Sequence, residues 1–296
     1  MNPRMRLLAL VAGTTLALAA NAFAQTVPAP APQAPAPAAA TPAAATPESA
    51  ALDRAIGGSW RSPINTARDK YRHPKQTLLF FGVRPTQSVV EITPGGGWYT
   101  EILAPYLYDH GHYFAVVEDP ESVKPADRAE MQDRNNQFEA KLALRPDLYV
   151  RTQVREIDPA APVLGPAGSA DVVLTFRNVH NWVMDGRQAA MFKAIFAVLK
   201  PGGVLGITDH RANPGPVTDG QQGYLTEQQV IDYATAAGLV LEAKSEINAN
   251  PKDTKDYPKG VWTLPPTLTL GEKDKGRYLA IGESDRMTLR FRKPAK

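Results

Sequence analysis

Three glycines stand in a segment that has the composition of a ligand-binding turn. Residues 91–100 read EITPGGGWYT, in which Gly95, Gly96 and Gly97 follow an apolar run. Glycine lacks a Cβ and tolerates positive φ, so the backbone can approach a ligand closely there, and a helix that starts after the turn offers its free N–H groups. Glu118 lies 21 residues after Gly97, where a carboxylate that ends the next strand can bind both ribose hydroxyls. These residues predict a nucleotide-like ligand.

Two classes of cofactor use such a turn. A dinucleotide fingerprint that begins at Gly95 requires a third glycine at position 100, where the sequence has Thr100. A nicotinamide-dependent oxidoreductase is therefore disfavoured. The other pattern is an acidic residue that ends the strand, followed by glycines at alternating positions. Here the residues are Glu91, Thr93, Gly95 and Gly97, with Thr93 in the place of the first glycine. Consecutive glycines also occur where a strand and a helix merely pack closely, and the acidic residues at 91 and 118 favour ligand binding over that reading.

Two histidines follow apolar runs and are candidates for proton transfer. His180 comes after residues 171–176 (DVVLTF), and His210 comes after residues 204–208. Imidazole titrates near neutrality, so either residue could act as a general base, and either could equally be a hydrogen-bonded structural histidine. Asp209 beside His210 suggests a metal only weakly, and we predict no metal site.

Other polar residues near the same strand ends have open roles. Arg177, Asn178 and Arg211 could orient an anionic or amide-bearing acceptor, or they could satisfy loop carbonyls. The segment 248–285 is longer than a simple hairpin and is expected to cover the substrate side. Helices within residues 51–82 are expected to form a lid over the cofactor.

The elements that must position these residues follow from the apolar pattern. Short apolar runs bounded by polar residues predict seven strands, at residues 88–92, 112–117, 148–157, 171–176, 204–208, from 239 onward, and 287–292. Helical patterns lie between them, among them residues 126–142 and two stretches whose capping-box spacings start at Asp185 and Thr226. Strands that alternate with helices predict an α/β fold with a doubly wound, Rossmann-like, mostly parallel sheet. The last run, MTLRFR, alternates apolar and polar residues and predicts a half-exposed, antiparallel edge strand.

The order of the motifs resembles that of class I S-adenosylmethionine-dependent methyltransferases. The residues Glu91, Thr93, Gly95 and Gly97 resemble the first motif of that family, E/D-x-G-x-G-x-G, except that Thr93 replaces the first glycine. The segment DVVLTFRNVHNW stands in the position of the fourth motif, and AVLKPGGVLGITDH is similar to the helix, turn and fifth strand of the family. The resemblance covers roughly residues 75–245 and the last strand. The whole chain resembles an exported, predicted-methyltransferase group of bacterial proteins.

The resemblance implies S-adenosylmethionine as the cofactor and a set of residues that hold it. Within this set Glu118 matches the ribose-binding acid, and Asp158 matches an acid found near the adenine. Trp98, and likewise Trp182, could contact the sulfonium by cation–π attraction or could simply pack in the core. The implied cofactor-binding residues are Glu91, Gly95, Gly96, Gly97, Trp98, Glu118, Asp158 and Asn178, and His210 and His180 are the candidate catalytic residues. The alternative is a noncatalytic periplasmic binding module that has kept the methyltransferase fold.

The N-terminal residues predict export. Arg4 and Arg6 precede an apolar run, and Ala22-Phe23-Ala24 resembles a signal-peptidase site, so we predict a signal peptide at 1–24 and a periplasmic protein. The Ala/Pro-rich segment 25–50 predicts a disordered linker, and 51–296 the methyltransferase-like domain. Cleavage lowers the formal charge from +3 to +1, which argues against nucleic acid as a partner. We expect a small-molecule or envelope acceptor, and no integral membrane segment after cleavage. The chain has no cysteine, which excludes disulfides and thiolate metal sites.

Overall fold

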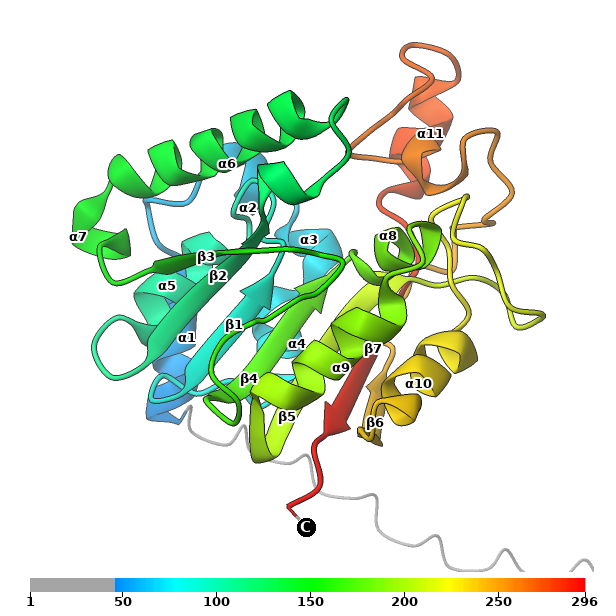
Figure 1. Ribbon diagram of the computed structural model, residues 1–296. Coiled ribbons are helices and arrows are strands. Elements are labelled where there is room, and N and C mark those ends of the chain that lie inside the picture. The colour runs from blue at the N-terminus through cyan, green and yellow to red at the C-terminus, as the bar shows by residue number, and fades with distance from the viewer. Residues whose placement is uncertain (1–45, 296) are drawn as a thin grey trace, which may run out of the picture. The chain divides into compact units, whose positions relative to one another are not determined.

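A seven-stranded sheet organises the part of the chain that the computed structural model describes, residues 46–295. The strand order is β3-β2-β1-β4-β5-β7-β6, and helices cover both faces (Figure 1). The predicted signal peptide and nearly all of the predicted linker lie outside the described residues. The first helix, α1, begins at Pro47, four residues before the domain boundary that we predicted. Among residues 46–295, no helix combines the length and apolar character needed to cross a membrane.

The strands confirm the predicted fold. All neighbouring pairs from β3 to β5 are parallel, and β7 runs antiparallel to both β5 and β6. The carboxyl ends of β1, β2, β4 and β5 therefore meet at one edge, where a ligand is expected in a doubly wound sheet. The strands are β1 Ser88–Ile92, β2 His112–Glu118, β3 Gln153–Ile157, β4 Ala170–Phe176, β5 Leu199–His210, β6 Val240–Ser245 and β7 Arg286–Arg292.

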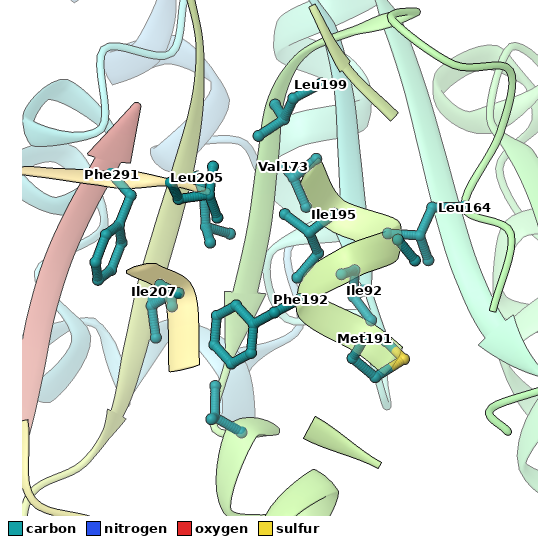
Figure 2. Packing of buried hydrophobic residues seen from close by; sticks show 14 of the residues in the cluster. Ile92, Leu164, Val173, Met191, Phe192, Ile195, Leu199, Leu205, Ile207 and Phe291 are labelled. Carbon is teal, nitrogen blue, oxygen red and sulfur yellow. The ribbon is translucent and has the colours of Figure 1, made fainter. Parts of the chain in front are cut away.

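The helices divide between the two faces of the sheet. One core cluster joins α1, α4 and α5 to β1, β2 and β4, and the other joins α8, α9 and α10 to the opposite face. In Figure 2, Phe192 and Ile195 of α9 pack against the strands beside Val173 and Leu205. The helices are α1 Pro47–Ile56, α2 Pro63–Thr66, α3 Asp69–Arg72, α4 Pro74–Phe80, α5 Thr100–Leu107, α6 Arg128–Ala143, α7 Pro146–Tyr149, α8 Val179–Met184, α9 Gln188–Val198, α10 Glu227–Ala236 and α11 Lys275–Ile281, with 3-10 turns at Pro120–Ser122 and Gly260–Thr263.

The prediction that the last strand is a half-exposed edge was wrong. Strand β7 lies between β5 and β6, and most of its residues are buried. Its polar side chains reach partners rather than solvent, since Thr288 accepts from the Asn248 amide, Arg290 donates to the Phe80 carbonyl, and both Arg290 and Arg292 pair with Glu242. The half-exposed edge strand is β6, whose residues alternate in exposure.

One of the two predicted capping boxes was also wrong. Thr226 caps α10 as expected, because its side chain accepts a hydrogen bond from the Gln229 N–H. Asp185 instead follows the last residue of a short helix, α8, that the sequence pattern did not predict. Helix α9 starts after Arg187 without a side-chain cap. The additional helix places the residues after β4 directly over the end of β5.

Candidate functional site

A large cavity lies at the carboxyl ends of β1 and β2. Its volume is about 710 Å³, within the range of about 300 to 1,000 Å³ that is usual for small-ligand sites. Thr93, Pro94 and Gly95 line it from the turn after β1, and Glu118 lines it from the end of β2. Helix α6, which Figure 1 shows above this side of the sheet, provides the opposite wall with residues that include Phe138. We call this the main cavity.

The turn after β1, residues 93–97, has the backbone that close approach to a ligand requires. Gly95 and Gly97 have φ values of 57° and 76°, and Thr93 has a φ of 50°. A left-handed conformation is rare for a β-branched residue, so the strained backbone at Thr93 is a specific feature of this turn. A Cβ built on Gly95 meets no protein atom within 4 Å, whereas one on Gly97 comes within 3.3 Å of Phe138 and Lys141. Gly95 therefore faces open space, and Gly97 packs against α6.

Glu118 is placed to bind a polar group inside the main cavity. Its Oε1 lies 3.3 Å from the Arg187 guanidinium, and among residues 46–295 its Oε2 makes no hydrogen bond. Arg187 also pairs with Asp185, so it is held from two sides and orients the Glu118 carboxylate. A carboxylate with one fixed and one free oxygen suits a ribose diol.

Glu91 lies beneath the turn rather than in the main cavity. Its carboxylate is buried and accepts a hydrogen bond of 2.6 Å from the Tyr113 hydroxyl. Burial raises the pKa of Glu91 to about 7, and the hydrogen bond from Tyr113 offsets only part of that shift. The sequence predicted Glu91 as a cofactor-binding residue, but it does not line the main cavity, and its partner Tyr113 also hydrogen-bonds Thr100 at the start of α5.

Glu91 should make the stability of the fold depend on pH. An unfolded chain ionises this carboxyl near pH 4.5, while the folded chain resists ionisation until about pH 7. The stabilisation from neutral Glu91 is present in full below pH 4.5 and is lost as pH rises through 7. We expect wild-type stability to fall over this window, relative to Glu91→Gln, by on the order of 3 kcal/mol. Urea unfolding of both proteins across pH 4–8 measures the difference, with the exposed Glu139→Gln as the control, and parallel stability curves for Glu91→Gln and wild type would contradict the assignment.

Other predicted cofactor residues lie outside the main cavity. Gly96 is not among its lining residues, and neither is Asp158, which is exposed and accepts a hydrogen bond from the Ala160 N–H. Pro159 and Ala160, just after Asp158, do line the cavity. Asn178 is buried and donates to the Ile92 carbonyl at 2.9 Å. Its amide joins the ends of β1 and β4, so its role in the structure is to hold the two strand ends together.

The two tryptophans pack in the core instead of lining the cavity. Trp98 donates from Nε1 to the Asn65 carbonyl, and the guanidiniums of Arg61 and Arg72 lie over its ring. Trp182 is fully buried and contacts Phe192 edge-on. Neither indole is thus available for a sulfonium in the main cavity.

Sequence reasoning missed several residues of the cavity wall. Met131, Asn135 and Phe138 of α6 line it, and so do Asn181 and Met184 of α8. Met131 and Phe138 are seven residues apart in a mostly polar helix, and this spacing could have identified a ligand-facing stripe. The segment 51–82, which we expected to form a lid, contributes no residue to this cavity.

The predicted histidines come together with Asp209 at the ends of β4 and β5. His180 Nδ1 lies 2.8 Å from Asp209 Oδ1, and the rings of His180 and His210 are 5.1 Å apart. His210 Nδ1 contacts the Ser284 hydroxyl, and Trp262 lies against His180. Residues of the segment 248–285 therefore cover this end of the sheet.

The surroundings of Asp209 favour an imidazole–carboxylate pair over a metal centre. The side chains of His180, Asp209 and His210 are close enough to ligate one ion. However, Asp209 Oδ1 also accepts from the His210 N–H, and Oδ2 accepts from the Val179 and His180 N–H groups. Both oxygens are thus used by N–H donors. If Asp209 accepts the Nδ1 proton, His180 keeps a free lone pair on Nε2.

His210 and Arg211 differ in character although they are adjacent. Burial, followed by the nearby His180 and Arg177, holds the pKa of His210 well below its usual range, so this imidazole is neutral. Arg211 forms ion pairs with Glu227, Glu246 and Asp285. Its guanidinium is fully engaged by these acids and acts as a structural clamp.

Among the comparisons with known proteins, the one with solved structures identifies the fold. No protein-family model matches the sequence, and no curated protein is similar to it in sequence. A solved S-adenosylmethionine-dependent methyltransferase from Aquifex aeolicus is 15% identical, with a TM-score of 0.51 over 83% of this chain and 98% of that one. The [4+2]-cyclase SpnF is also 15% identical, with a TM-score of 0.52 over 83% of this chain and 92% of that one. The fold is therefore shared by proteins with different reactions.

Proposed function

We propose that this chain, which has the fold of class I S-adenosylmethionine-dependent methyltransferases, is itself such a methyltransferase. The observation that carries the proposal is the main cavity, where the open backbone at Gly95 and the half-free carboxylate of Glu118 face the same space. A nucleoside fits these two features together, because one requires close backbone approach and the other a pair of hydroxyls.

In such a reaction the residues of this chain mainly have to align the cofactor and the acceptor. The bound cofactor supplies an electrophilic methyl group on its sulfonium, and the transfer is an in-line displacement that depends mainly on alignment. The turn at 93–97 and Glu118 would fix the nucleoside. An acidic acceptor also requires a base, and His180 Nε2 is the candidate because Asp209 orients the imidazole from its other side.

Calorimetric titration tests the proposal without knowledge of the acceptor. S-adenosylhomocysteine should bind saturably, and NAD should not, because Thr100 occupies the position of the third dinucleotide glycine. Binding of neither ligand at millimolar concentration would leave the alternative, a noncatalytic binding module that has kept the fold. Binding of NAD alone would indicate an oxidoreductase.

Glu118 provides a specific prediction for this binding. Glu118→Ala should weaken S-adenosylhomocysteine binding by about 1 to 3 kcal/mol, because a charged hydrogen-bond acceptor is lost. Glu121→Ala is the matched control, since Glu121 carries the same charge three residues later, pairs with Arg128 and does not line the cavity. Calorimetry on both variants gives the affinities. An equal loss in the two would mean that general electrostatics, and not a contact from Glu118, explains the effect.

The cellular location is part of the proposal. The residues that predict export, Arg4 to Ala24, support an enzyme that acts on a small-molecule or envelope acceptor in the periplasm. N-terminal sequencing of the mature protein should give a start near Gln25. Recovery of the chain from spheroplasts with Met1 still present would contradict export.

A further inference from the structure

A second, smaller cavity is lined by arginines. It lies at the ends of β4, β5 and β7, has a volume of about 10 Å³ and is bordered by Arg72, Arg177 and Arg286. Thr208 and Asn248 complete its polar wall. A volume of this size admits about one water-sized group. None of its lining residues lines the main cavity, so the two spaces are separate features of the same sheet edge.

The donors around this second cavity are buried without partners. Among residues 46–295, the guanidinium of Arg72 makes no hydrogen bond, and its Nε and one terminal nitrogen are fully buried. Arg286 Nε and Thr208 Oγ1 are likewise buried without a hydrogen bond in this part of the chain. Arg72, Arg286 and Thr208 are each at most 5% exposed. Unsatisfied buried donors cost free energy. Several of them around one cavity indicate a missing acceptor.

The charges around the second cavity are also unbalanced. Arg68, Arg72 and Arg286 all face one carboxylate, Glu283, at 2.5, 3.6 and 3.1 Å. Arg177 forms no ion pair within the described residues. Burial would raise the pKa of Glu283, but the guanidiniums of Arg286, Arg72 and Arg68 together lower it to about 2. Burial, and then the neighbouring Arg68, lowers the pKa of Arg177 to about 10. Glu283 thus pairs with three guanidiniums, and Arg177 stands beside them without an ion pair in the described part of the chain; we call Arg68, Arg72, Arg177 and Arg286 the arginine cluster.

The backbone holds Arg177 at the second cavity under strain. Arg177 has a φ of 63°, a left-handed conformation that is uncommon for a residue with a Cβ. Its N–H donates to the Thr208 carbonyl at 2.7 Å, which fixes Arg177 against β5. Such strain concentrates at functional sites, because the surrounding structure must maintain it.

The arginine cluster adjoins the imidazole–carboxylate pair. Arg177 stands three residues before His180, and Arg286 is opposite His210 in the β5–β7 register. Thr208 and His210 are two residues apart on β5, so both side chains project from the same face. A ligand anchored in the second cavity would therefore extend toward the histidines.

We propose that the arginine cluster binds a carboxylate of the methyl acceptor. This inference rests on the proposed function, because it names the class of acceptor for the same site. A planar carboxylate can present one oxygen to a space of about 10 Å³ and can pair with guanidiniums through parallel hydrogen bonds. A phosphate group has more oxygens to place around this space. The carboxylate fixes one end of the acceptor, while the atom to be methylated lies near His180.

The test measures the melting temperature in sodium acetate and in sodium chloride at equal concentration. Saturating acetate should raise the melting temperature of the wild type by about 2 to 4 °C relative to chloride. Arg177→Met should abolish this rise, and Arg72→Met provides a second variant if the first does not fold. Arg292→Met is the matched control, because Arg292 lies on the same sheet but is paired with Glu242, so its rise in acetate should be unchanged.

Further arms separate this inference from its alternatives. A general salt effect would persist in Arg177→Met, and a larger rise in phosphate than in acetate would indicate a phosphate site, so either result overturns the inference. Calorimetry with S-adenosylhomocysteine and with 5′-methylthioadenosine, which lacks the amino-acid carboxylate, identifies the source of the carboxylate. If Arg177→Met weakens only the former, the cluster holds the cofactor and the inference is wrong. If wild type binds neither nucleoside, the proposed function fails, whatever acetate does.

Discussion

Replacement of His180 by alanine is expected to lower the rate of methyl transfer by about 10²- to 10⁴-fold, the usual contribution of a general base. The cofactor affinity should stay nearly constant, because His180 does not line the main cavity. Asp209→Asn should have a comparable effect, since an amide no longer fixes the imidazole with a free lone pair on Nε2. Transfer of label from S-adenosylmethionine to carboxylate-bearing envelope metabolites measures the rate.

Controls separate chemistry from stability in this prediction. His110→Ala is the matched control, because His110 is exposed and is distant in sequence from the strand ends. Melting temperatures with S-adenosylhomocysteine show whether each variant is folded. Full activity in both His180→Ala and Asp209→Asn would mean that alignment alone suffices. Loss of activity in proportion to loss of folded protein would assign His180 a structural role.

Gly95→Val is expected to weaken the binding of S-adenosylhomocysteine by about two orders of magnitude. The added side chain would enter the main cavity, because no protein atom lies within 4 Å of a Cβ at this position. Overpacking of about 3 kcal/mol corresponds to a loss of affinity of about 100-fold. The positive φ adds a strain of about 1 to 3 kcal/mol to the folded state, so affinity and stability must be measured on the same preparation by calorimetry and urea unfolding.

Gly271→Val provides the matched control for this substitution. Gly271 has a φ of 61° and also has open space around its Cβ position, but it does not line either cavity. It should therefore lose a similar amount of stability and keep its affinity. Gly97→Val is less informative, because its side chain would also collide with Phe138 and Lys141. Normal binding by a folded Gly95→Val protein would place the ligand elsewhere.

Much of the fold could be predicted from the sequence because its signals are local. The run 88–92 forms β1 with the predicted bounds, and Thr226 caps α10. Alternation of strands and helices restricts the topology to a doubly wound sheet. The same locality explains why the glycine turn and Glu118 were found, since both lie at the ends of consecutive strands.

The errors arose where distant residues determine the environment. The arginines of β7 were interpreted as solvent-facing, but Arg290 reaches Phe80 and Glu242, which are far from it in the sequence. For Trp98, which could contact the sulfonium or pack in the core, the sequence did not show that Arg61 and Arg72 of the N-terminal segment cover its ring. Hydropathy patterns carry no information about such partners.

The sequence by itself determined which segments form strands, the turn at 93–97 and the carboxylate at the end of β2, because each depends on residue types a few positions apart. Only the tertiary structure decided that Asp209 pairs with His180, that Glu91 lies beneath the turn, and that three arginines share Glu283. Arg72 and Arg286 are separated by more than 200 residues, and their shared cavity exists only because β7 inserts beside β5. The type of each side chain can be read from the sequence. Its burial, its partners and the excess of positive charge around it depend on how the sheet brings distant segments together.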